Sequence, residues 1–275
     1  MMLETLTRGA DAIRAVGEVM VADASPDVVV LYQDIQRSLR VPFVNFIFRA
    51  LANRPDYLRD AWQTMAPGVR TQAFEALTDE LRERALAAVA SWPGEEEMVW
   101  PAGEDGETLR RFTETIRYVL PQLVTVITAL HTDRIAPRPE TLRSGARSET
   151  PLEGSLGLPM RAAQGAPGAV ITLYEDIKDH HGHPGVASYY RALGFWPEAL
   201  QRAWGIVRPH VNTPGFVDAR KALLQVADVG VAQRFVVPQP AIAPESQIRD
   251  LLGFFRYRLA IDLLLDVSLL TVRTR

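Results

Sequence analysis

The chain has no cysteine among its 275 residues. This absence excludes disulfides, thiolate nucleophiles and cysteine-ligated metal sites, and it fits a reducing cytoplasm, where we expect the protein to act. The formal net charge is only −3, so no basic field is available for nucleic acid or for an acidic membrane surface. The most apolar stretch, 259–272, is too short to span a bilayer, and we expect no signal peptide at the N-terminus.

The chain also lacks the alternation of apolar and polar residues that is typical of β-strands; apolar residues recur at helical spacing instead. The stretch 91–106, rich in Pro, Gly and Glu, and the Pro-rich stretch 237–244 predict loops. The fold class is therefore predicted to be all-α. Helices are predicted over 26–39, after Pro42, after Pro55, over 70–91, 107–129 and 168–179, after Pro184, after Pro197, near 218–229, and from 246 onward.

What the chain does have is a duplication. Residues 31–67 and 173–209 align without a gap at an offset of 142, and 14 of 37 positions are identical, whereas chance predicts roughly two. We therefore predict two tandem homologous helical repeats, 1–130 and 167–275, joined by a linker at 131–166. The last helix of each repeat is too apolar to remain in solvent, so the repeats are expected to form an intramolecular pseudo-dimer with a site between them.

The shared residues form the pattern Y-x-D-I-x(6)-P-x-V-x(4)-R-A-L-x(3)-P-x(2)-L-x(2)-A-W, which begins at Tyr32 and again at Tyr174. This pattern resembles the group I 2-haloacid dehalogenases, the DehI family, over essentially the whole chain. The resemblance implies an all-helical enzyme that hydrolyses 2-haloalkanoic acids with inversion. It also implies an aspartate that activates water, an asparagine that helps to hold the water, and no metal or cofactor. The implied partner is a small-molecule carboxylic acid.

Two positions depart from the family pattern. The resemblance places the catalytic aspartate directly after a serine, but here Ser188 is followed by Tyr189. It places the asparagine before a proline in the last helix of the first repeat, where this chain has Leu120. Tyrosine, with a pKa near 10, is a poor base at pH 7, and leucine cannot bind water.

Two interpretations follow from these departures. The protein is either a hydrolase resembling 2-haloacid dehalogenases that uses another base, or a divergent member without that activity. The divergent member would bind a small apolar carboxylate or catalyse another reaction in the same cleft. A homodimer through the outer faces also stays open.

The remaining site candidates are substitutes for the missing groups. Phe43 and Phe46 are expected to line the substrate pocket together with Leu120 and Ser188, since the resemblance places aromatic residues there. Ordinary core packing is the alternative for the two phenylalanines. Arg191 is a candidate to hold the substrate carboxylate through two hydrogen bonds.

Two acidic residues and a histidine cluster complete the list of candidates. Asp262 and Asp266 lie one turn apart on an apolar helix, and burial would raise their pKa towards that of a general base. Asp262 is the first candidate for the base, next to Tyr189. The alternative is that the two aspartates pair with arginines of the facing repeat or face water at the C-terminus. For His180, His181 and His183 we predict a solvated loop instead of a metal site, with substrate binding or proton transfer left open.

Two further aspartates occur in both repeats. Asp34 and Asp176 each precede an isoleucine at the same repeat position. Because they are symmetric, we expect a structural role for them, either bonding to Arg49 or Arg191 or capping a neighbouring helix.

Overall fold

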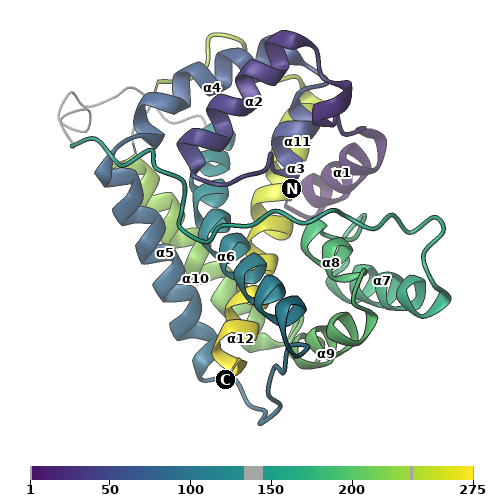
Figure 1. Ribbon diagram of the computed structural model, residues 1–275. Helices are drawn as coiled ribbons and strands as arrows, with labels where there is room; N and C mark the ends of the chain where they lie inside the picture. The colour runs from purple at the N-terminus through teal and green to yellow at the C-terminus, as the bar shows by residue number, and fades with distance from the viewer. Residues whose placement is uncertain (1, 133–144, 236–237, 275) are drawn as a thin grey trace.

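The computed structural model describes residues 2–132, 145–235 and 238–274. Every regular element within these ranges is a helix and none is a β-strand, so the all-α prediction is confirmed (Figure 1). The elements are α1 (Met2–Ala15), η1 (Val21–Asp23), α2 (Pro26–Leu39), α3 (Phe46–Leu51), α4 (Pro55–Val69), α5 (Gln72–Ala90), α6 (Glu104–His131), α7 (Gly168–His181), α8 (Ser188–Leu193), α9 (Pro197–Val207), α10 (Pro214–Gln233), α11 (Ser246–Phe254), η3 (Phe255–Ala260) and α12 (Ile261–Arg273).

The helices from α2 to α5 recur in the same order as α7 to α10. The recurrence extends to the caps: the Thr71 side chain accepts a hydrogen bond from the N–H of Phe74, and Thr213 accepts one from Phe216. Both threonines satisfy a backbone donor that the first turn of a helix leaves unpaired. This agreement supports the duplication, and the proposed division at 131–166 remains a prediction.

Four long helices form the centre of the molecule: α5 and α6 from the first half of the chain, and α10 and α12 from the second (Figure 1). α12 packs against both α5 and α6. Every residue of α6 from Val119 to Leu130 is buried, as are most residues of α12. The two apolar terminal helices therefore cover each other, which is the arrangement expected from their composition.

The structure differs from the predicted helices at both ends of the chain. The single helix predicted from 246 consists of α11 and α12 with the π-helical turn η3 between them. Helix α1, which the sequence pattern does not predict, packs against α11. Their backbones approach so closely that a Cβ on Gly9 would lie 2.5 Å from the carbonyl oxygen of Asp250.

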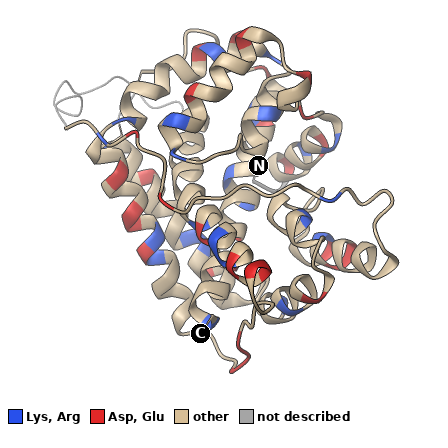
Figure 2. Ribbon diagram, viewed as in Figure 1, with Lys and Arg blue, Asp and Glu red and all other residues tan. Residues whose placement is uncertain are grey.

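The described part of the linker, 145–166, runs along the surface of both halves of the molecule. On the first half, the backbone N–H of Gln72 donates to the carbonyl of linker residue Gly145. On the second half, the backbone N–H of linker residue Arg161 donates to the carbonyl of Arg191. Figure 2 shows acidic and basic positions interspersed over the visible helices. None of the described helices is both long and apolar enough to cross a membrane.

Candidate active site

Tyr189, where the resemblance places the catalytic aspartate, lies where α8 meets α6. Its hydroxyl is 3.0 Å from Thr113 Oγ1, and its ring stacks on Phe112 with 5.8 Å between centroids. Thr113 donates its single hydroxyl proton to the Leu109 carbonyl at 2.8 Å, so Tyr189 is the donor to Thr113. Burial raises the pKa of Tyr189. A phenol that keeps its proton, and already donates it in a hydrogen bond to Thr113, is unsuited to act as a general base.

Leu120 and Ser188 lie on the same two helices. Leu120, where the resemblance places an asparagine, is buried in α6. Ser188 is the first residue of α8 and is half-buried. The contact between α6 and α8 thus brings together elements from both halves of the molecule, but it provides neither of the two polar groups that the family pattern leads one to expect.

The two aromatic candidates lie around α3. Phe46 opens this helix and stacks on Phe255 of η3, with 6.3 Å between ring centroids. Phe43 precedes α3 and contacts the linker, since a Cβ at Gly157 would lie 3.1 Å from its ring. Both rings are partly buried against the core. Phe46 therefore joins the first half of the chain to the π-helical turn of the second half.

Arg191, the candidate for the substrate carboxylate, is paired with a carboxylate of the protein itself. Glu18 lies between two arginines that are 142 residues apart: Arg49 donates to it through Nε at 2.8 Å, and Arg191 through Nη1 at 3.3 Å. Arg49 is buried and also donates to the Val44 carbonyl. The residue that corresponds to Glu18 in the second repeat is Met160, which lies 3.9 Å from Arg49 Nη2. One carboxylate therefore links α3 to α8.

Asp34 and Asp176 make the same contact in each half. Asp34 accepts a hydrogen bond from Trp62 Nε1 at 2.8 Å, and Asp176 accepts one from Trp204 Nε1 at 2.6 Å. Each aspartate also pairs with the arginine that directly follows the helix carrying its tryptophan, which is Arg70 after α4 and Arg208 after α9. The prediction that Arg49 or Arg191 is the partner is thus wrong. Contacts that recur in the same form in both halves support the expected structural role.

Asp262 lies at the centre of a buried ionic cluster. Its Oδ1 accepts from Arg220 Nε at 2.5 Å, and its Oδ2 accepts from Arg258 Nε at 3.2 Å and lies 3.1 Å from His183 Nε2. Both arginines belong to the same half of the chain as Asp262, so the alternative of pairing with arginines of the facing repeat is wrong for this residue. Burial alone would raise the pKa of Asp262, but bonding to His183 and the positive charges lower it to about 2.

Asp266 is in a different environment one turn further along α12. Its Oδ2 accepts a hydrogen bond from the Tyr190 hydroxyl at 2.9 Å and lies 3.1 Å from His181 Nε2. Its Oδ1 is buried and accepts no hydrogen bond from the described residues. Burial raises the pKa of Asp266, although the attraction of His181 partly offsets this effect. No arginine contact to this carboxylate is present in the described ranges.

The two histidines at the end of α7 are buried, and the prediction of a solvated loop is wrong for them: His181 is 1% exposed and His183 8%. Burial alone would lower the pKa of His181, but its contact with Asp266 and the charge of Asp262 produce a net rise. For His183, burial dominates and lowers the pKa to about 4. The two imidazoles stack with 4.7 Å between centroids, so one positive charge disfavours the other.

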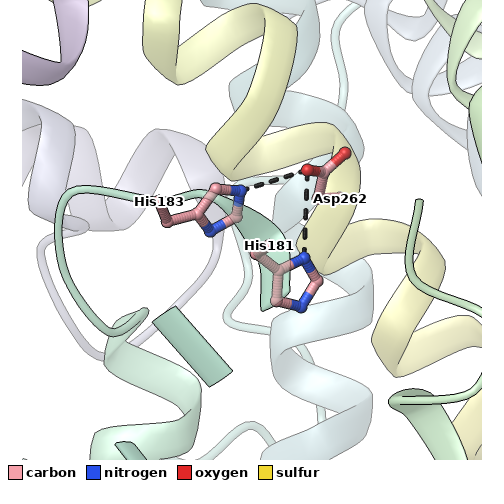
Figure 3. A group of neighbouring side chains, drawn as sticks. All are labelled: His181, His183 and Asp262. Atoms are coloured by element: carbon pink, nitrogen blue, oxygen red, sulfur yellow. Dashed lines mark hydrogen bonds and ion pairs between the residues drawn. The ribbon is translucent and has the colours of Figure 1, made fainter. Parts of the chain in front are cut away.

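Figure 3 shows the group of potential metal ligands that the described residues form: His181, His183 and Asp262, whose ligand atoms lie within 4.8 Å of one another. Two of the clustered histidines therefore do converge, with a carboxylate from α12. However, the guanidinium groups of Arg220 and Arg258 already occupy the Asp262 oxygens. A cation would have to enter next to two fixed positive charges, so the group suits an internal ion-pair cluster better than a metal site.

Sequence reasoning singled out Asp266 but missed Tyr190 and Glu18 as polar partners. Tyr190 directly follows Tyr189 and corresponds to Phe48 in the first repeat. Glu18 corresponds to Met160. In both pairs, one repeat has a polar residue where the other has an apolar residue. This difference between the repeats is the sequence signal that could have identified Tyr190 and Glu18 as functional candidates.

Comparison with known proteins agrees with this all-helical architecture. A family model described as "Halocarboxylic acid dehydrogenase DehI" matches residues 42–151. A configuration-inverting 2-haloacid dehalogenase of Alcaligenes xylosoxydans xylosoxydans is 36% identical over 189 residues, which are 65% of this chain and 64% of that protein. An (R)-2-haloacid dehalogenase of Pseudomonas putida is 26% identical over 209 residues, covering 72% of this chain and 69% of that protein.

A crystal structure of a D-2-haloacid dehalogenase mutant superimposes with a TM-score of 0.79 at 20% identity, covering 92% of this chain and 94% of the other. The fold is therefore the all-helical fold of D-2-haloacid dehalogenases. The resemblance of this chain to the group I 2-haloacid dehalogenases, the DehI family, is confirmed. The chain spans 64% of the length of the Alcaligenes relative.

Proposed function

We propose that this protein is a hydrolase that removes halide from small 2-halocarboxylic acids by attack of an activated water molecule on C2. The observation that carries the proposal is the 36% identity to a relative named as a configuration-inverting 2-haloacid dehalogenase. Direct displacement of halide by water inverts C2, and it requires a base to take the proton of the water. No metal or cofactor is part of the proposal, and the proposed location is the cytoplasm.

The proposed site lies at the contact between the two halves of the molecule. Phe43 and Phe46 are proposed to contact the alkyl group and the halogen, together with Leu120. Arg191 is proposed to hold the substrate carboxylate, because its side chain is 29% exposed and its hydrogen bond to Glu18 uses Nη1, which leaves Nη2 and Nε without a hydrogen bond to the described residues. Ser188 is proposed to contact the substrate from the start of α8.

The test is chloride release from D- and L-2-chloropropionate by the purified protein, with heat-denatured protein as the control. Bromide release from the bromo analogues extends the assay to a better leaving group. Release from either enantiomer supports the proposal, and chirality of the lactate product reports inversion. No release from any of the four substrates contradicts it. Thermal stabilisation by these acids without turnover would then indicate a site that binds and does not hydrolyse.

A further inference from the structure

The proposed reaction lacks an obvious base. Tyr189 keeps its proton and donates it to Thr113. Asp262 is ionised but surrounded by donors on both oxygens, and a carboxylate with a pKa of about 2 has little tendency to accept a proton near neutral pH. The described residues contain one other fully buried carboxylate, that of Asp266.

We propose that Asp266 is the general base of this protein, with the Tyr190 hydroxyl bonded to one of its oxygens, His181 next to that same oxygen, and the other oxygen left to accept a water proton. The assignment rests on the proposed function. The geometry behind it is that Oδ2 contacts both partners while Oδ1 is buried and accepts no hydrogen bond from the described residues. Such an oxygen is able to orient a water molecule and to take its proton.

The location of Asp266 agrees with this role. It lies on α12, the helix that packs against α5 and α6 of the first half. Tyr190, its hydrogen-bond donor, is adjacent in sequence to Tyr189, and the two rings contact each other with 5.3 Å between centroids. Asp266 is thus separated from the family's base position by one side chain, so a carboxylate from α12 replaces the one missing from α8.

The first repeat shows that the fold does not require this polar group. Taking Tyr118 with Tyr257, the residue equivalent to Asp266 is Ile127, which is fully buried. The equivalents of His181 and Tyr190 at the offset of 142 are Leu39 and Phe48, and both are buried too. Apolar side chains therefore fill the same positions in a homologous unit. Because a buried ionic group commonly stabilises a fold less than apolar residues of similar volume, a structural role alone does not explain these three residues.

The step balances as follows. Asp266 Oδ1 takes one proton from water while the water oxygen forms the new bond to C2. The carbon–halogen bond breaks at the same time, and its electron pair leaves with the halide. The products are the 2-hydroxycarboxylate, the halide ion and a proton on Asp266 Oδ1.

Several charged and titratable groups surround Asp266. His181 comes from α7, Tyr190 from α8 and Asp262 from its own helix, and each of them affects its pKa. Arg220 and Arg258 bond to Asp262, and they affect Asp266 through that carboxylate. Tyr189 lies close enough for the Asp266 charge to raise its pKa.

Two variants test the assignment. Asp266→Asn keeps the shape and the acceptor for Tyr190, and it should lower kcat for halide release about 100-fold to 10,000-fold, the usual contribution of a general base. Tyr190→Phe removes a donor that favours ionised Asp266, so the acid limb of the kcat/KM profile should move to higher pH by about one unit. A structural role does not predict this shift.

The matched controls come from the first repeat. Like Asp266, Asp34 accepts a hydrogen bond from an aromatic side chain and contacts a basic one, here Trp62 and Arg70. Asp34→Asn should change kcat less than threefold. Tyr32→Phe removes a buried tyrosine hydroxyl that donates to the Val19 carbonyl, and it should leave the acid limb in place. Circular dichroism and melting temperature establish that each variant is folded.

The outcomes separate the two proposals. If the wild type releases no halide, the proposed function fails, and the assignment of Asp266 fails with it. If the wild type is active and Asp266→Asn retains a third or more of its kcat, only the assignment is overturned. Should Asp266→Asn not fold, the Tyr190→Phe profile decides: a shifted acid limb supports the assignment, and an unshifted limb overturns it.

Discussion

Replacing Glu18 by glutamine should weaken the connection between α3 and α8 without changing the shape of the side chain. The Arg49 side chain is only 7% exposed, and its Nε and Nη2 atoms lie 2.8 and 2.7 Å from the Glu18 carboxylate. Removing one partner of a buried pair costs about 3–5 kcal/mol, mainly because the other charge stays buried. Since Glu18 itself is 21% exposed and glutamine keeps one acceptor, we expect a loss of about 2–3 kcal/mol in unfolding free energy.

Urea denaturation followed by circular dichroism measures this loss. The matched control is Glu245→Gln, which removes the partner of Arg54 in a pair whose side chains are 51% and 60% exposed. Exposed pairs contribute little, so this control should change the unfolding free energy by less than about 1 kcal/mol. An unfolding free energy for Glu18→Gln within about 0.5 kcal/mol of the wild type would refute the reasoning, because such a change is typical of an exposed surface position.

The cross-repeat part of the contact has its own test. Arg191→Met and Glu18→Gln both remove the Glu18–Arg191 pair, so their effects should not add in the double variant. We expect a coupling energy of about 0.5–1 kcal/mol, because Arg191 is 29% exposed and lies 3.3 Å from the carboxylate. Full additivity would mean that the two halves are not coupled through Glu18.

Three further predictions concern the core of the molecule. Tyr189→Phe should leave halide release within threefold of the wild type and lower the unfolding free energy by about 1 kcal/mol, the loss of one hydrogen bond; a large loss of kcat would instead make the phenol part of the chemistry. His183, with a pKa lowered from 6.5 to about 4, binds its proton more weakly in the folded than in the unfolded state. Stability should therefore fall by about 3 kcal/mol as the pH drops from 6.5 to 4, and urea titrations of His183→Asn across this range should lack that component. Gly9→Ala should lower the melting temperature because its Cβ would meet the Asp250 carbonyl at 2.5 Å, whereas Gly205→Ala, with no neighbouring atom within 4 Å, should preserve or raise it; equal effects at the two sites would contradict the close approach of α1 and α11.

The sequence predicts most helices because their signals are local. Proline at the first turn marks α2, α4 and α9, and apolar spacing marks the long helices. The π-helical turn within the last helix has no such local signature, since its extra residue is accommodated by tertiary packing. Helix α1 depends in the same way on α11, a contact with residues more than 200 positions away.

The candidate site is less predictable, because its polar contacts join distant parts of the chain. The run His180 to His183 has the composition of a solvated turn, and nothing nearby in the sequence indicates burial. Its environment comes from Asp262, which is 79 residues away from His183. The composition of α12 does indicate that its two aspartates need partners. It does not indicate that one of them takes two arginines and the other a tyrosine and a histidine.

The duplication has two consequences for function. Residues that the repeats share make the same contact twice, as Asp34 and Asp176 do with their tryptophans, so they cannot distinguish one side of the site from the other. A reaction that attacks C2 from one face needs groups that occur once. Glu18 and Asp266 meet this requirement, since each is a carboxylate whose repeat equivalent is apolar and each contacts α8. We therefore expect chemistry to depend on the positions where the two repeats differ, within a scaffold defined by the positions that they share.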